Sequence, residues 1–269
     1  MPIFARAAYA DGLDTSTLLL LRFALAAALL WTLFLVRGER LPGRRGLLML
    51  AGMGGIGYAG QAFSYFTALT LASAGLVALL LYLYPALVTL LSRLLGHHLS
   101  GAQVLLVGMA LLGSVLTIGR AGDGKPLGIF FGLLAALIYS GYILVGSRLP
   151  ADVTPAASSA LVATSAGLVY GAVALFRGVR LPQSAAGWGA VAAIAVVCTV
   201  LAIAFFLAGL ARIGPVKASI YSTVEPAFTL LLAALLLGET VTALRLVGGA
   251  LIIGAVILLA RLDLRRAPL

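Results

Sequence analysis

Acidic residues and cysteine are scarce in this sequence, and each scarcity excludes a class of protein. Its 269 residues include eight aspartates and glutamates and a single cysteine, Cys198, so neither a disulfide framework nor a thiolate metal site can form. Every aspartate lies in an expected connection or near a terminus, and no His-Glu-x-x-His motif occurs. Adjacent His97 and His98 would point to different faces of a helix, which disfavours a metal site. Because intramembrane catalysis needs paired carboxylates, a metal triad or an activated nucleophile, we predict a protein that is not an enzyme and uses no cofactor.

Long polar stretches are also missing. Charged residues make up 10% of the chain and hydrophobic residues 62%, with a mean hydropathy of +1.15. A soluble domain of this length cannot hide so much apolar surface, so lipid must surround most of the chain. The formal charge of +10 could suggest nucleic acid. However, lysine and arginine occupy short connections between apolar runs, which is typical of membrane topology and argues against a nucleic-acid partner.

Apolar runs long enough to cross a bilayer recur along the whole chain. They cover about 15–36, 46–69, 72–95, 101–119, 126–147, 155–176, 185–209, 214–237 and 241–260. Glycine and proline punctuate the connections. The glycines inside the second run, Gly52, Gly54, Gly55, Gly57 and Gly60, favour close packing of helices. The sequence therefore predicts an all-α polytopic membrane protein with nine full spans.

Three short motifs recur in the same order in the two halves of the chain. They are Arg37-Gly-Glu-Arg-Leu-Pro with Arg177-Gly-Val-Arg-Leu-Pro, Tyr84-Pro85-Ala86 with Glu225-Pro226-Ala227, and Leu95-Gly96-His97 with Leu237-Gly238-Glu239. An odd number of spans separates equivalent points, so the two copies would cross the membrane in opposite senses. Inverted-topology repeats are typical of transporters, with the binding site near the midplane between them.

The repeat predicts two domains of five helices each, 1–121 and 122–269. Shifting the fifth run back by the repeat length places the opening helix of the first copy partly before Met1. We therefore expect a ten-helix fold whose first helix is incomplete in this numbering. The larger number of basic residues falls on the side of the C-terminus, for example Arg40 and Arg261, which predicts a cytoplasmic C-terminus.

These marks resemble the drug/metabolite transporter superfamily, specifically its EamA-type exporters. The matching residues are Leu21-Arg22-Phe23, Pro85, Glu225-Pro226-Ala227-Phe228, Leu237-Gly238-Glu239 and Gly248-Gly249-Ala250-Leu251. The resemblance covers essentially the whole chain and implies two inverted five-helix repeats around a central cavity. Within the family the chain is most similar to bacterial exporters of aromatic and other amino acids, which implies an inner-membrane location.

Polar residues on shared helical faces predict the lining of that cavity. The candidates are Tyr58, Gln61, Tyr65, Ala78, Tyr82, Tyr139, Ser140, Ser219, Ser222, Thr223 and Glu225. Tyrosine rings and hydroxyls suit a zwitterion with an apolar or aromatic side chain. The alternative is that the tyrosines belong to the interfacial belt and that the hydroxyls bond within their own helices. We interpret Pro85 and Pro226 as the hinges.

Two charged residues lie inside apolar runs. Glu225 can meet a substrate ammonium, carry a coupling proton, or brace neighbouring helices through hydroxyls. For Arg22, we expect snorkelling to the interface or pairing with a carbonyl rather than contact with substrate.

The predicted function is export of small organic metabolites, including aromatic amino acids, by alternating access. The alternatives are a different metabolite or drug carried by the same fold, or a passive channel. A phosphate ester or nucleotide sugar is disfavoured because it needs several cationic residues in the cavity, and a channel because no ring of repeated polar residues is evident. The expected partners are a small zwitterion and the lipid bilayer, and a monomer is compatible with the sequence.

Overall fold

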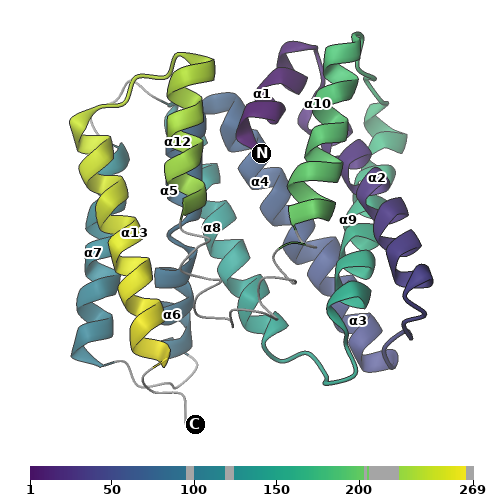
Figure 1. The fold of residues 1–269 in the computed structure, drawn as a ribbon, viewed down its shortest axis with the longest axis horizontal. Coiled ribbons are helices and arrows are strands. Elements are labelled where there is room, and N and C mark those ends of the chain that lie inside the picture. The colour runs from purple at the N-terminus through teal and green to yellow at the C-terminus, as the bar shows by residue number, and fades with distance from the viewer. Residues whose placement is uncertain (95–99, 119–123, 203–204, 206–223, 265–269) are drawn as a thin grey trace. The chain divides into compact units, whose positions relative to one another are not determined.

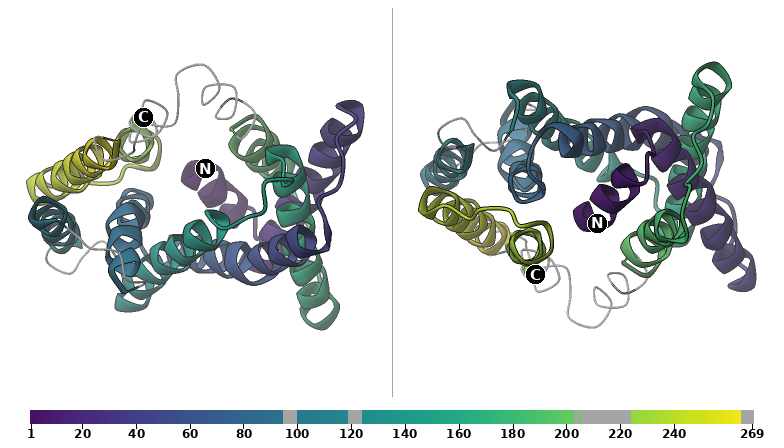
Figure 2. Two further views of the ribbon diagram at one scale, coloured as in Figure 1. Left: turned by 90° about the horizontal axis from the view of Figure 1, so that it is seen from below. Right: turned by 90° about the horizontal axis from the view of Figure 1, so that it is seen from above.

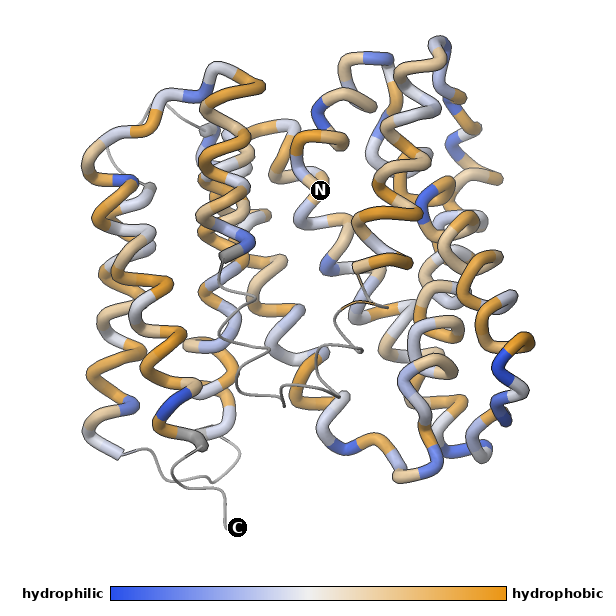
Figure 3. The backbone as a smooth tube through the Cα atoms, in the orientation of Figure 1, coloured by the Kyte–Doolittle hydropathy of each residue, from blue (hydrophilic) through white to orange (hydrophobic). Residues whose placement is uncertain are grey.

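Helices form the regular structure throughout the part of the chain that the computed structural model describes (Figure 1). That part comprises residues 1–94, 100–118, 124–202, 205 and 224–264. An isolated bridge pairs Ala72 with Gly124. Hydrophobic residues run along the helices, and hydrophilic residues gather mainly at helix ends and connections (Figure 3). The predicted all-α membrane class is therefore confirmed.

The helical segments are bounded as follows. They are α1 (Pro2–Ala10), α2 (Thr15–Val36), α3 (Arg44–Gly52), η1 (Met53–Tyr58), α4 (Ala59–Leu71), α5 (Ala74–Leu81), α6 (Tyr84–Leu94), α7 (Gly101–Ile118), α8 (Pro126–Gly146), α9 (Pro155–Arg177), α10 (Ala185–Ala195), η2 (Val196–Leu201), α12 (Val224–Leu237) and α13 (Ala243–Leu264). The segments η1 and η2 are π-helical.

Five helices of the described chain are long and apolar enough to cross a membrane. They are Thr15–Val36, Pro126–Gly146, Pro155–Arg177, Ala243–Leu262 and Ala74–Ser92, the last of which contains the turn at residues 82 and 83 between α5 and α6. Shorter apolar helices occupy Gly101–Thr117, Ala185–Leu201 and Glu225–Leu237. The run predicted at 46–69 is helical but is divided among α3, η1 and α4. The nine-residue α1 stands where an incomplete opening helix is expected.

The chain divides into two compact units that differ from the two predicted sequence repeats. The first unit consists mainly of Ile3–Phe66 and Tyr142–Leu207, and the second of Thr67–Gly141 and Ala208–Leu269. Each unit thus takes one segment from either half of the sequence, and the boundaries fall within α4 and α8. The division into repeats 1–121 and 122–269 stays a prediction.

In the first unit, α2 packs along α9 and α10, and η1 packs against α9. Gly54 permits the close approach of η1 to α9, because a Cβ there would lie 2.6 Å from the Val162 carbonyl oxygen. Gly55 has only ordinary contacts and Gly52 has none, so the glycines of this run do not all serve packing. Trp31 adds a bond from its indole nitrogen to Thr164 Oγ1 at 2.8 Å.

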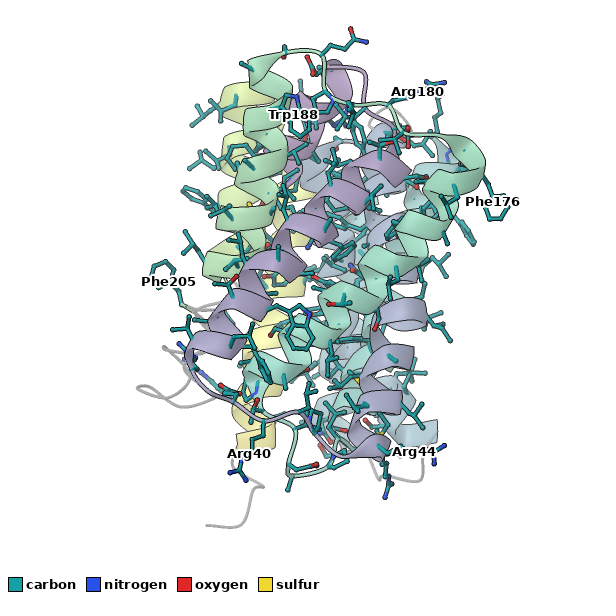
Figure 4. All side chains as sticks on the ribbon, turned by 90° about the vertical axis from the view of Figure 1, so that its right-hand side faces the viewer. Arg40, Arg44, Phe176, Arg180, Trp188 and Phe205 are labelled. Atoms are coloured by element: carbon teal, nitrogen blue, oxygen red, sulfur yellow. The ribbon has the colours of Figure 1, made fainter. Side chains whose placement is uncertain are left out.

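The outer surface of the first unit suits lipid (Figure 4). Phe176 and Phe205 project outward and are 90% and 71% exposed, and Trp188 is partly exposed. Arg40 and Arg44 lie at one end of the unit and Arg180 at the other. Apolar side chains therefore cover the outer surface between two charged ends, as a bilayer requires.

In the second unit, α7 and α13 lie side by side in all views (Figures 1 and 2). The two helices touch at Gly113 and Gly248. The absence of a side chain permits this contact, because a Cβ at Gly113 would lie only 2.7 Å from the Gly248 carbonyl oxygen. Nearby, α12 packs on α5. Gly238 ends α12 with a φ of 64°, a conformation that glycine adopts without strain. The following Glu239 accepts hydrogen bonds from the N–H groups of Ala74 and Gly75 at 2.6 and 3.1 Å, which caps the start of α5.

The span predicted at 72–95 is interrupted directly before Pro85. Helix α5 ends at Leu81, residues 82 and 83 form a turn, and α6 begins at Tyr84. Because proline lacks an N–H and its ring crowds the preceding turn, it favours such a break. The role of Pro85 as a hinge stays a prediction.

We expect Gly113→Ala to destabilise the second unit, because the added methyl would collide with the backbone of α13. Overpacking of this kind costs about 1–3 kcal/mol. Gly108→Ala is the matched control on the same helix, since a Cβ at that position meets no atom within 4 Å, and it should be neutral or mildly stabilising. Thermal unfolding in detergent would measure both variants. Equal melting temperatures would argue against the glycine contact.

Asp11, in the connection between α1 and α2, holds this connection to Gln183 and Ser184 at the start of α10. We expect this attachment to weaken in acid. Hydrogen bonds from the Ser184 side chain, and from the backbone of Ser184 and Gln183, hold the pKa of the Asp11 carboxyl below its usual value. The stabilisation is therefore present above the ordinary aspartate pKa of about 4 and is lost as the pH falls through the lowered native pKa. Asp11→Asn should lower the melting temperature at neutral pH, and its difference from wild type should shrink on acidification. A difference independent of pH would contradict this role.

Candidate functional site

The first unit buries a guanidinium among apolar helices. Arg22 lies about 10 Å along α2 from the start of the helix, at 1.5 Å per residue, and it is 4% exposed. Its Nε donates to Thr199 Oγ1 at 3.2 Å, and a terminal nitrogen donates to the Tyr58 hydroxyl at 3.1 Å. Both acceptors are neutral, so these bonds orient the guanidinium without balancing its charge.

Aromatic rings surround this side chain. The guanidinium carbon lies 5.0 Å from the ring centroid of Phe23, 5.8 Å from that of Tyr58 and 5.4 Å from that of Phe66. Such contacts contribute about 0.5–2 kcal/mol each. The Phe23 ring stacks on Tyr170 at 5.8 Å, and the Tyr170 hydroxyl donates to the Ala59 carbonyl at 2.6 Å. The rings are thus held by their own packing and hydrogen bonds.

Both hydroxyls that bind Arg22 come from π-helical segments. Tyr58 is the last residue of η1, and Thr199 lies within η2. Thr199 also donates to the Ile194 carbonyl at 2.9 Å, so its oxygen can accept from the guanidinium while its proton is used elsewhere. Short π-helical segments occur frequently at functional sites. Here two of them meet at one buried cation.

The expectation that Arg22 snorkels to the interface or pairs with a carbonyl is wrong. The side chain points into the first unit and is bound by hydroxyls and rings. Sequence alone could not decide this, because the outcome depends on which residues η1 and η2 bring to the second turn of α2. The available signal was a charge inside an apolar run, which is costly in lipid and therefore usually faces protein or a cavity.

The second unit has its own polar cluster, formed by α5, α6, α8 and α12. The Tyr82 hydroxyl donates to Glu225 Oε2 at 2.9 Å. Tyr82 is 7% exposed, whereas Glu225 is exposed. The rings of Tyr84 and Tyr139 pack edge to face at 4.9 Å, and the Tyr84 ring lies 6.0 Å from that of Tyr82. A carboxylate accessible at one edge of a tyrosine cluster can accept a hydrogen bond or a cation.

Ser140 serves the helix break in this unit. Its buried hydroxyl approaches the carbonyl oxygens of Ala136 at 2.7 Å and Tyr84 at 3.2 Å. The second of these follows the turn at residues 82 and 83. The alternative interpretation, in which hydroxyls bond within their own helices, describes the bond to Ala136 but not the contact with Tyr84. The role of Ser140 in binding stays a prediction.

The remaining predicted site residues have mixed outcomes. Gln61 and Tyr65 are buried on α4, at 8% and 3% exposure, and Tyr65 packs on Phe66. Ala78 is buried one turn before Tyr82. Ser219, Ser222 and Thr223 lie outside the described residues, and Pro226 is buried in α12. Sequence reasoning missed Thr199, Tyr170, Phe66 and Tyr84 as members of the two clusters.

Comparison with known proteins shows the family of this chain. The EamA-like transporter family matches the chain over residues 1–119 and again over 126–261. The chain belongs to the EamA-like transporter family. It is therefore a multi-pass membrane protein of a family of transporters, which implies a small-molecule substrate, and the predicted superfamily is confirmed.

Relatives of this EamA-like protein are also named as transporters. The uncharacterized transporter YcbK of Bacillus subtilis is 28% identical over 91% of this chain and 83% of its own length. The uncharacterized inner membrane transporter YedA of Escherichia coli K12 is 27% identical over 88% of this chain and 78% of its own. A solved crystal structure with 24% identity has a TM-score of 0.65 and covers 98% of this chain and 95% of its own, which shows the fold alone.

In this EamA-like transporter we expect Tyr82 and Glu225 to be energetically coupled. Tyr82→Phe and Glu225→Gln should each weaken the same hydrogen bond, so the double variant should be destabilised by less than the sum, with a coupling energy of roughly 0.5–2 kcal/mol. Tyr84→Phe is the control, because ring packing rather than a hydroxyl bond connects it to the cluster. Unfolding free energies in mixed micelles would measure the cycle, and additive effects would show that the pair is not coupled.

Proposed function

We propose that the protein exports small zwitterionic metabolites, amino acids with aromatic or apolar side chains among them, across a bacterial inner membrane by alternating access. The observation that carries this proposal is the Tyr82–Glu225 pair. Its carboxylate is exposed, lies on an otherwise apolar helix, and is fixed by a tyrosine hydroxyl at 2.9 Å.

The chemistry of this pair suits an ammonium group. A carboxylate that accepts one bond from a neutral hydroxyl still has lone pairs available. Ammonium–carboxylate hydrogen bonds are stronger than neutral ones, and a site away from water strengthens them further. The nearby rings of Tyr84 and Tyr139 provide apolar surface against which a side chain can stack.

The proposed mechanism is supported by membership of a transporter family and by the break between α5 and α6. We propose that the translocation pathway passes Glu225 and Tyr82 and is open to one side of the membrane at a time. Pro85, which directly follows a break between α5 and α6, and Pro226 would supply the bending. The two inverted repeats with their central cavity and the cytoplasmic C-terminus belong to the same proposal.

Uptake into proteoliposomes tests the substrate and the role of Glu225 together. We expect labelled phenylalanine or another amino acid to enter with saturable kinetics, and unlabelled solute inside the vesicles to accelerate entry, as alternating access requires. Glu225→Gln should reduce uptake at least tenfold, because a neutral amide replaces the charge that binds the ammonium. Tyr82→Phe should have a smaller effect.

An imposed pH gradient separates proton coupling from ammonium contact. If Glu225 carries a coupling proton, the gradient should stimulate wild type and leave Glu225→Gln unaffected. Non-saturable uptake without exchange would indicate a channel. Failure of every amino acid in a broad panel would overturn the substrate proposal and leave the family assignment intact.

A further inference from the structure

The first unit contains a buried positive charge that none of its own carboxylates balances. Its four acidic residues are committed elsewhere. Asp11 binds the N–H groups of Gln183 and Ser184, Asp14 binds Thr17, Glu39 binds Thr154, and Asp152 binds the Gly43 N–H. The residues of this unit outside the described range, Ile203, Ala204, Phe206 and Leu207, are all apolar. No carboxylate of this unit is therefore available to Arg22.

The charge on Arg22 persists despite its burial. Arginine stays protonated in proteins, and an unbalanced charge inside an apolar bundle is costly. Two hydroxyls and three aromatic rings compensate part of this cost. They leave the remaining N–H groups of the guanidinium without an acceptor in the described residues.

Tyr58 provides a second donor at the same place. Its oxygen accepts a bond from the guanidinium, so its own proton points away from Arg22. No described residue is recorded as the acceptor of this proton. Tyr58 is only half-buried and its ring lies 5.8 Å from that of Tyr142, so the hydroxyl stands at the edge of the cluster.

We propose that Arg22 and Tyr58 form a binding site for the carboxylate of a small organic solute. The carboxylate would accept bonds from the free guanidinium N–H groups and from the Tyr58 hydroxyl, and it would supply the missing countercharge. This inference rests on the proposed function, because the proposed zwitterionic solutes carry such a carboxylate. Thr199 and the aromatic rings act as positioning residues that keep the guanidinium oriented before the solute arrives.

The composition of the cluster favours a monoanionic carboxylate over a phosphate group. One guanidinium balances one negative charge, and its planar fork matches the geometry of a carboxylate. A phosphate monoester carries nearly two charges and usually recruits several cations. Arg22 is the single cationic member of the described cluster.

Ligand-induced stabilisation of the purified full-length protein tests this site without requiring transport. The probes are acetate, benzoate and phenylalanine, each compared with its own amide at rising concentrations. We expect at least one carboxylate to stabilise wild type at concentrations tenfold or more below those its amide requires. Arg22→Gln should abolish this preference, and Arg22→Lys should retain part of it because the charge stays while the fork is lost. Arg177→Gln, at an exposed position of the same unit, should behave like wild type.

Tyr58→Phe keeps the test decisive if Arg22→Gln does not fold. This variant keeps the Arg22 charge and should reduce the preference for a carboxylate over its amide several-fold. If wild type binds every acid no better than its amide, or if Arg22→Gln keeps the preference, the proposal is wrong. Carboxylate binding without amino-acid transport would support this site and overturn the proposed function. Amino-acid transport without a preference for carboxylates over amides would support the proposed function and overturn this site.

Discussion

Lipid offers no hydrogen bonds, so each interruption of a helix in this chain has to be compensated by the protein itself. The described breaks follow this constraint. Thr199 donates to the Ile194 carbonyl within η2, the Tyr170 hydroxyl reaches the Ala59 carbonyl directly after η1, and Ser140 approaches the Tyr84 carbonyl after the turn that separates α5 from α6. One of these hydroxyls, that of Thr199, also binds the buried guanidinium of Arg22, and the Tyr170 ring stacks on Phe23 beside it. At Arg22, therefore, the irregular backbone and the buried charge share side chains, because a side chain that satisfies a broken helix is already inside the bundle.

The same constraint explains where the carboxylates lie. Of those whose side chains are described, four bind backbone N–H groups at helix starts or connections, and Glu39 binds a loop hydroxyl. Glu225 alone among them sits on an apolar helix with a tyrosine as its partner. A helix start can absorb a negative charge at little cost because its N–H groups and dipole favour it. Glu225 also lies in the first turn of its helix, α12, so it stands out by its partner, a tyrosine hydroxyl, rather than by its place in the helix.

Much of the helical pattern could be predicted from the sequence, and the clusters in part: Tyr82 and Glu225 were predicted lining residues, whereas Thr199 was missed. The bounds 15–36 were predictable because an apolar run begins after the capping residue Asp14 and ends before Gly38, whose φ is 60°. The π-helical segments were missed, because one extra residue in a turn leaves no clear trace in composition. They matter for the site, since a π-helical turn shifts the face on which every later residue lies. Tyr58, the last residue of η1, contacts Arg22, whereas Gln61 and Tyr65, predicted on the same face, are buried on α4. Ser219, Ser222 and Thr223 lie outside the described residues.

The motifs that identify the family have structural explanations that say little about cargo. Gly238 ends α12 with a positive φ, Glu239 caps α5, and Gly248 lets α13 touch α7. Any transporter with this fold needs these features whatever it carries, so a family match predicts architecture better than substrate. The side chains that the fold does not need are the better indication of the substrate. A helix bundle would lose little by having leucine at Arg22 or Glu225, since both charges are costly in an apolar environment. Their presence is the reason that we propose a solute that carries charges of its own.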